Sequence, residues 1–108
     1  MMGDKELIYA AEIWSVKQGK EEEFLKIWTD LANWTKANEM CSIGIILLQD
    51  LEQKNRFISF GPWKTSTCVQ AWRQQPEFKT AFVKLKEMCD EIKLSTMKSV
   101  FNIPQGMM

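Results

Sequence analysis

The stretch that decides the fold is "FISFGPWKTS", residues 57–66. It begins as an alternating apolar strand and reaches Pro62, which has no N–H group and therefore ends the hydrogen-bonded ladder of a strand. Thr65 and Ser66 then offer side chains that commonly cap the first turn of a helix. The sequence therefore predicts a strand that runs directly into a helix, with Trp63 at the junction.

Upstream, the pattern predicts a strand, a helix and a second strand. Residues 6–14 carry Ile, Tyr and Trp without a helical stripe, and a turn at Gly19 follows them. Residues 20–38 place apolar side chains at intervals of three and four, which predicts an amphipathic helix. Residues 42–50 form a nearly continuous apolar run, and a polar turn joins this strand to the one ending at Trp63 as a hairpin.

Downstream, a second helical segment begins at Pro76, a residue that fits the first turn of a helix. Its apolar side chains keep helical spacing as far as Ile92, and residues 94–103 alternate as a last strand. This order predicts an α+β, ferredoxin-like βαββαβ fold, with a four-stranded antiparallel sheet and the helices on one face. We expect a single domain over residues 1–108, with its core at about 7–103 and short disordered termini.

The strands carry apolar residues at both odd and even positions, so both faces of the sheet are apolar. Because the helices cover only one face, the other would be exposed in a monomer. In the first strand, Tyr9, Ala11 and Ile13 alternate with Ile8 and Ala10. An exposed apolar face of this kind is normally covered. A second copy packed sheet to sheet about a two-fold axis is the simplest cover, because such a contact needs only one surface. We therefore expect a homodimer.

The composition argues against several classes of partner and site. The 14 basic and 14 acidic residues balance, so no net charge attracts nucleic acid or an anionic membrane. The N-terminal residues resemble neither a secretory signal nor a membrane span, and we expect a cytoplasmic protein. The chain has no His, the commonest general base and metal or haem ligand at neutral pH. Cys41, Cys68 and Cys89 lack metal-ligand spacing, and we expect free thiols that pack as small apolar side chains.

With these elements in place, "FISFGPWKTSTCVQAWRQQPEFKTAF", residues 57–82, resembles the antibiotic biosynthesis monooxygenase family. The resemblance covers about residues 7–103 and rests on the order of Trp63, the Ser/Thr cap, Trp72 and the "QPEF" that opens the next helix. Members of this family fold as dimeric α+β barrels. They include cofactor-free oxygenases of polyketide anthrones, quinol oxygenases and haem-degrading enzymes, so the resemblance implies the fold more firmly than the reaction.

Three positions test the haem-degrading branch of that family. Its members use an Asn near the end of the first strand, a Trp at the end of the third strand and a His on the last helix. This chain has Ile13, Trp63 and Phe82 at those places. The changes remove a hydrogen-bonding group and the iron ligand together. We therefore expect no haem, no metal and no other cofactor.

A candidate pocket for a small aromatic ligand lies between the helices and the helix-facing side of the sheet. Its candidate linings are Tyr9, Ile13, Phe57, Ser59, Trp63, Phe78 and Phe82. Regularly spaced aromatic side chains usually bury themselves, so the three Phe residues are also, and more simply, explained as core. Trp63 is either core or the wall of a site, because its indole N–H needs a partner. We predict that Trp63 lines the pocket and closes it.

The sequence identifies no residue as catalytic. Glu12 is one candidate base, because a carboxyl group buried among apolar strand residues has a raised pKa. Exposure at a sheet edge, or a pair with Arg56 or Lys98 across strands, is the interpretation that we favour for Glu12. A water held by Ser59 or Tyr9, or the acidity of the substrate itself, are the remaining candidates.

Two functions are compatible with these observations. The first, which the resemblance implies, is a cofactor-independent monooxygenase acting on a small aromatic or phenolic compound, quinol- or anthrone-like. The second is a non-catalytic dimer of the same fold that binds a hydrophobic ligand or has a structural role. A carboxylate or hydroxyl group that points into an enclosed void would favour the enzyme.

Overall fold

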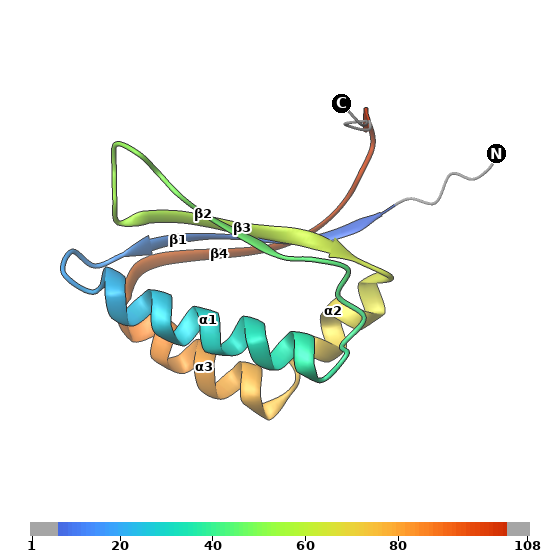
Figure 1. Cartoon of the computed structure of the whole chain (residues 1–108), viewed down its shortest axis with the longest axis horizontal. Coiled ribbons are helices and arrows are strands. Elements are labelled where there is room, and N and C mark those ends of the chain that lie inside the picture. Colours follow the sequence, from blue (N-terminus) through green and yellow to red (C-terminus); the bar gives the residue numbers. More distant parts are fainter. Residues whose placement is uncertain (1–6, 104–108) are drawn as a thin grey trace.

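The computed structural model of the chain describes residues 7–103. Its elements, in chain order, are β1 (Ile8–Val16), α1 (Glu21–Ala37), β2 (Ile46–Gln49), β3 (Arg56–Trp63), α2 (Ser66–Arg73), α3 (Pro76–Glu87) and β4 (Cys89–Lys98) (Figure 1). The short termini that the sequence predicts to be disordered lie outside the described residues.

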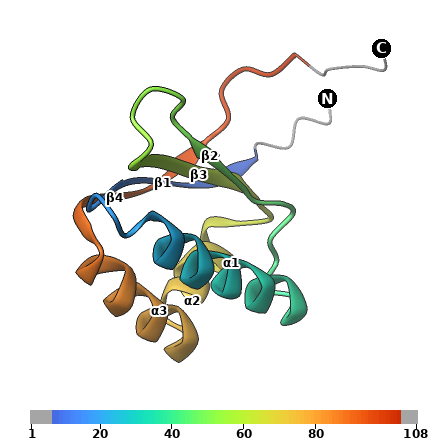
Figure 2. The same cartoon turned by 60° about the vertical axis from the view of Figure 1, so that its left-hand side comes forward.

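The four strands form one antiparallel sheet in the order β2-β3-β1-β4. The three helices all lie on one face of this sheet, with α1 and α3 packed side by side (Figures 1 and 2). This is the predicted ferredoxin-like arrangement. β1 is a central strand, and its midpoint, Glu12, lies opposite Ser59 of β3 on one side and Leu94 of β4 on the other.

Local sequence signals start each helix where they were predicted to act. Before α1, Gly19 adopts a φ of 91° and its N–H donates to the Glu21 carboxylate (2.9 Å). At α2, the Thr65 hydroxyl accepts from the N–H of Cys68 (3.1 Å), and α3 opens with Pro76. Among residues 7–103, no helix is both long enough and apolar enough to cross a bilayer.

Several of the predicted boundaries are wrong. The helical spacing continues to Ile92, but α3 ends at Glu87 and β4 already begins at Cys89, because Met88 accepts a hydrogen bond from the N–H of Lys17 (2.8 Å) and aligns the chain with β1. Residues 94–103 are therefore only in part a strand, since β4 ends at Lys98. The predicted strand over 42–50 is also shorter, because only Ile46–Gln49 pairs continuously with β3.

The core lies between the sheet and the helices in two connected clusters. At one end, Trp14, Phe24 and Phe57 pack with Leu85. At the other end, Trp63, Trp72 and Phe78 pack with residues that include Ala10, Leu31 and Val69. Phe82 contacts both clusters. The even-numbered residues of β1 are therefore the buried ones, so the side chain of Glu12 faces the helices.

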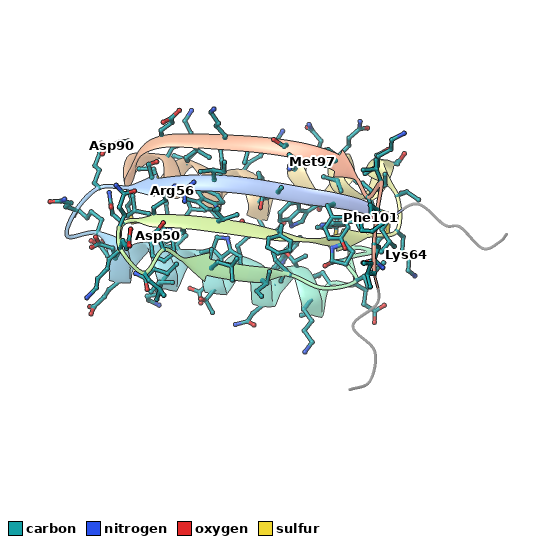
Figure 3. The ribbon with its side chains drawn as sticks, turned by 90° about the horizontal axis from the view of Figure 1, so that it is seen from above. Asp50, Arg56, Lys64, Asp90, Met97 and Phe101 are labelled. Carbon is teal, nitrogen blue, oxygen red and sulfur yellow. A yellow bond between two sulfur atoms is a disulfide. The ribbon has the colours of Figure 1, made fainter. Side chains whose placement is uncertain are left out.

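Within residues 7–103, no helix lies over the opposite side of the sheet, which is largely apolar. Figure 3 looks onto this side, with Met97 labelled on β4. We call it the open face, and the strand registers assign to it Tyr9, Ala11, Ile13, Ile46, Leu48, Ile58, Phe60, Pro62 and Met97. Several of these side chains are exposed, Met97 by 54% and Ile46 by 46%. A face of this kind is unusual for an isolated monomer.

Candidate functional site

A buried carboxylate marks the centre of the sheet. Glu12 is 4% exposed, on the helix-facing side of β1 between Ala10 and Trp14. Its Oε1 accepts a hydrogen bond of 2.5 Å from the hydroxyl of Ser59, directly across on β3. The Ser59 oxygen in turn accepts from the indole N–H of Trp14 at 2.9 Å. This chain of donors orients the carboxylate and fixes the direction of the hydroxyl.

The second oxygen of Glu12 faces a cation from α2. Arg73, the last residue of that helix, places Nη2 3.2 Å from Glu12 Oε2. The same guanidinium donates to the carbonyl of Ser95 (3.0 Å) and to the hydroxyl of Thr96 (3.0 Å), both on β4. Its Nε is buried and has no hydrogen-bond partner among residues 7–103. Arg73 therefore ties α2 to two neighbouring strands at the level of Glu12.

Burial dominates the acidity of this carboxyl group. It raises the pKa of Glu12 above the ordinary value of 4.5, while the hydrogen bond from Ser59 and the charge of Arg73 act in the opposite direction. A raised pKa makes the ionised form a stronger proton acceptor. Burial and a raised pKa are features that carboxyl groups at functional sites often share.

Glu12 borders a small, partly enclosed cavity, with a volume of about 10 Å³. Its other walls are Trp14, Trp28, Leu31, Ala32, Ile45, Trp72 and Phe78. A space of this size holds about one water molecule. The site thus combines one ionisable group with a mostly aromatic wall.

A larger, more open cavity of about 680 Å³ lies next to it. It is bounded by the C-terminal half of α1 and by residues 39–45, with Lys64 at its edge. Ala32 and Ile45 border both cavities, so they separate the outer space from the space beside Glu12. A third hollow, of about 370 Å³, runs between α1 and α3 and has no buried ionisable group in its wall.

The structure brings together fewer of the predicted site residues than the sequence suggested. Ser59 and Phe78 lie at the Glu12 cavity or in contact with Glu12. Tyr9 and Ile13 were expected on the helix-facing side, and this placement is wrong. Both belong to the open face, because the strand alternates and the even residues of β1 are the buried ones. Tyr9 packs there against Phe60, with ring centroids 6.4 Å apart.

Trp63 is a core residue in this structure. It is 1% exposed, its ring centroid lies 4.8 Å from that of Trp72, and it does not border the cavity beside Glu12. Phe82 is likewise packed, stacked on Phe78 at 5.7 Å and edge-on to Trp14 at 6.5 Å. The interpretation of these aromatic side chains as core is the one that the packing favours, and Phe57, 1% exposed, agrees with it.

The favoured interpretation of Glu12 is wrong, because its carboxyl group is buried and its pKa is raised, whereas its role as a base stays a prediction. Glu12 is not at a sheet edge, because β1 is paired on both sides. Arg56 lies further along β3, opposite Ser15, and pairs with Asp50 (3.4 Å), so it is not the partner. The ion pair with Arg73 was missed because a helix brings Arg73 to the strand from 61 residues away, and strand pairing rules carry no signal for such a contact.

The expectation of three free thiols is also wrong. Cys41 and Cys68 form a disulfide, with Cα atoms 6.0 Å apart. It joins the loop after α1 to the first turn of α2. Cys89 is a buried free thiol, as predicted, and burial raises its pKa to about 11, so it stays protonated at neutral pH. The cytoplasmic location stays a prediction, and the disulfide does not favour it, because such bonds are rare in reducing compartments.

Comparison with known proteins agrees with this architecture. The family model for antibiotic biosynthesis monooxygenase matches residues 7–84. No curated protein matches the sequence. Among residues 7–103, no group of three His, Cys, Asp or Glu side chains is placed to hold a metal ion.

Several solved structures share the fold. A conserved protein from Methanosarcina mazei Go1 is 24% identical, with a TM-score of 0.77 over 84% of this chain and 90% of the other. SnoaB, a cofactor-independent oxygenase from Streptomyces nogalater, solved as a point mutant, is 16% identical, with a TM-score of 0.80 over 94% and 100%. PA3566 from Pseudomonas aeruginosa is 12% identical, with a TM-score of 0.77 over 92% and 100%. Structural similarity at these low identities shows a shared fold alone. The family model, in contrast, matches most of the sequence itself. The chain therefore belongs to the antibiotic biosynthesis monooxygenase family.

Proposed function

We propose that this protein is a cofactor-independent monooxygenase of a phenolic, anthrone- or quinol-like compound. The observation that carries the proposal is Glu12, a carboxyl group with a raised pKa at the wall of an aromatic cavity. Family membership and the fold shared with a cofactor-independent oxygenase support the same class of reaction. The substrate is named only by its chemistry, an acidic and electron-rich aromatic.

In this reaction the protein removes one proton and keeps water out. The carboxylate of Glu12 accepts the proton, and the resulting substrate anion donates electrons directly to O₂. For an anthrone, the ring CH₂ becomes C=O, one oxygen atom of O₂ enters the product and the other leaves as water. The two hydrogens of the CH₂ group end in that water, so no further reductant is needed.

Ser59 and Arg73 act in this scheme as positioning residues. The Ser59 hydroxyl donates to Oε1 and Arg73 to Oε2, so each oxygen of the carboxylate has a defined partner. Both contacts stabilise the ionised form and keep the pKa of Glu12 from rising as far as burial alone would take it. They therefore favour the form of Glu12 that accepts a proton.

The assembly that we propose is a homodimer formed through the open face. Its apolar side chains lie on all four strands, and the helices cover only the other side of the sheet. A two-fold contact would bury the exposed Ile46, Leu48 and Met97 together. The roles of Tyr9 and Ile13 would then lie in this interface rather than in substrate binding.

One observation favours the second candidate function, a non-catalytic protein that binds a hydrophobic ligand or only maintains the fold. The cavity beside Glu12 holds about one water molecule and has no room for an aromatic ring unless a wall moves. The two functions differ in one measurable property, turnover.

Oxygen uptake with 1,8-dihydroxyanthrone, in buffer with a metal chelator, separates them. The enzyme predicts protein-dependent uptake of one O₂ for each ketone formed, above the spontaneous rate. Binding that quenches tryptophan fluorescence without any uptake would support the non-catalytic function. Neither binding nor uptake with anthrone and quinol probes would contradict the proposed function.

A further inference from the structure

We infer that Ile45 is the gate of the Glu12 cavity, and that the gap between Ile45 and Ala32 sets which ring systems reach the carboxylate. This inference rests on the proposed function, because it assigns an entrance and a size filter to that site. It concerns the segment 43–45, between the loop after α1 and the start of β2.

The two cavities define where an entrance has to be. The inner one, beside Glu12, has a volume of about 10 Å³, which is smaller than any aromatic ring. The outer one, at about 680 Å³, is in the range of small-molecule sites. Ala32 and Ile45 border both spaces. A ring that enters the inner space from the outer one therefore has to pass between these two side chains.

The walls around Glu12 are not equally free to move. The Trp14 indole is held by Ser59, and the Trp72 indole donates to Thr35 (2.9 Å), whose hydroxyl donates to the carbonyl of Leu31 (2.8 Å). These bonds fix two aromatic walls and the α1 backbone beside Ala32. Ile45 differs from them, since it is 38% exposed and lies outside the helices and strands.

The sequence places Ile45 over the cavity through a missing side chain on β3. Gly61 lies on the helix-facing side of that strand, opposite the buried Ala10. A Cβ atom at Gly61 would overlap the carbonyl of Gly44 and lie 2.8 Å from Cα of Ile45. The absent side chain thus lets the chain at 44–45 cross over β3. A Cβ atom built at Gly44 would meet no other atom within 4 Å, so the chain beside Ile45 borders open space on that side.

The chain is anchored on both sides of Gly44 and Ile45. Upstream, the N–H of Ile43 donates to the carbonyl of Pro62 (2.8 Å), and the disulfide holds Cys41 to α2. Downstream, Ile46 is already paired with Phe60 in the sheet. A movement that opens the inner cavity is therefore confined to Gly44 and Ile45, and the side chain of Ile45 is the part that blocks the passage.

This geometry favours a substrate longer than one ring. The reacting end would lie at Glu12, and the rest of the molecule would pass Ile45 and occupy the outer cavity. That outer space is edged by Lys36, Glu39 and Lys64, which suits polar substituents at the far end. A bicyclic or tricyclic phenol spans the two spaces, whereas a single-ring phenol leaves the outer one to water.

The test varies the size of the gate and of the probe together. Ile45→Ala and Ile45→Phe are compared with the wild type, and Ile43→Ala is the matched control, since Ile43 borders the outer cavity alone and is 54% exposed. Phenol, 2-naphthol and 1,8-dihydroxyanthrone are the probes, followed by tryptophan fluorescence and oxygen uptake. In Ile45→Ala, the preference for the tricyclic probe over phenol, measured as the ratio of their affinities and of their oxygenation rates, should rise about 10-fold or more. In Ile45→Phe this ratio should fall by a similar factor.

A second readout does not depend on any substrate. Acrylamide quenching reports access to the five tryptophans of the chain, and three of these, Trp14, Trp28 and Trp72, line the inner cavity. The quenching constant should rise in Ile45→Ala, fall in Ile45→Phe and stay unchanged in Ile43→Ala, with urea unfolding showing that all variants are folded. Unchanged probe ranking and unchanged quenching in both Ile45 variants would overturn the gate, even if the wild type turns over the anthrone. Altered quenching without turnover by any variant would support the gate and contradict the proposed function instead.

Discussion

Arg73 and Glu12 form a nearly buried ion pair, with 3.2 Å between guanidinium and carboxylate and side-chain exposures of 19% and 5%. Such a pair joins the end of α2 to the middle of β1. Its attraction lowers the pKa of Glu12, while burial raises it by more. In a packed core, an ion pair of this kind adds little net stability compared with apolar residues, but loss of one partner is strongly destabilising. Because the intact pair adds little net stability, its main effect in the folded protein is on the protonation state of Glu12.

Removal of the Arg73 charge should move the pH dependence of activity. In Arg73→Met the pKa of Glu12 rises further, because the attraction that opposed burial is gone. Since the ionised form is the base, the rising limb of the pH–rate profile should shift to higher pH. Arg73→Lys keeps the positive charge and should return the limb most of the way to its wild-type position. Arg56→Met is the control, since Arg56 pairs with Asp50 instead. A limb that stays in place, or moves to lower pH, in Arg73→Met would contradict this role.

The same raised pKa makes the stability of the protein depend on pH. Because the folded-state pKa of Glu12 lies above 4.5, its contribution is fully present below about pH 4.5 and is lost as the pH rises through the raised value. Glu12→Gln cannot ionise and lacks this dependence. Urea unfolding from pH 4.5 upward should therefore show wild-type stability falling relative to Glu12→Gln. A difference that is constant over this range would mean that the carboxylate is not destabilised by burial.

Loss of the disulfide should weaken the fold and loosen the loop after α1. Cys41 and Cys68 are 27 residues apart, a loop for which a cross-link typically contributes about 2–4 kcal/mol. Dithiothreitol should lower the free energy of unfolding of the wild type by this amount and leave a Cys41→Ser, Cys68→Ser double variant unchanged. Thiol titration of the unfolded, unreduced protein should count Cys89 alone. A count of all three cysteines would show that the bond does not form in solution.

A charge on the open face should break the proposed dimer. Ile58 lies in the middle of that face, between Ile13 of β1 and Leu48 of β2. Light scattering of the wild type should give about twice the chain mass of 12.6 kDa. Ile58→Lys should give the monomer or fail to fold, because an unpaired buried ammonium costs several kcal/mol. Val83→Lys, on the exposed side of α3, should leave the mass unchanged. A wild-type monomer at micromolar concentration would contradict the dimer.

Much of the fold was predictable because its signals are local. The apolar spacing of α1, the Thr65 cap of α2 and Pro76 at the start of α3 each act within a few residues, and all three were predicted. The boundary between α3 and β4 was not, because Cys89 and Ile92 fit a helical stripe and a buried strand equally well. Pairing with β1 decides between the two, and such pairing is not visible in the local sequence.

The candidate site was only partly predictable for a related reason. β1 is apolar in both parities, so the sequence did not decide whether Glu12 or its neighbours Tyr9 and Ile13 face the helices. The structure turns Glu12 inward. Arg73 and Ile45, which complete the site, come from a helix end and from a segment that was expected to be strand. Neither carries a motif, and only tertiary packing brings them to Glu12.

The most direct test of the central claim is the oxygenation rate of Glu12→Gln with 1,8-dihydroxyanthrone, measured beside the binding of the same probe. The variant keeps the shape of the side chain and removes its ability to accept a proton. Loss of a general base typically lowers the rate about 10²–10⁴-fold, and we expect a loss in this range with probe affinity retained. A variant that binds the probe and consumes oxygen at the wild-type rate would contradict the assignment of Glu12 as the base.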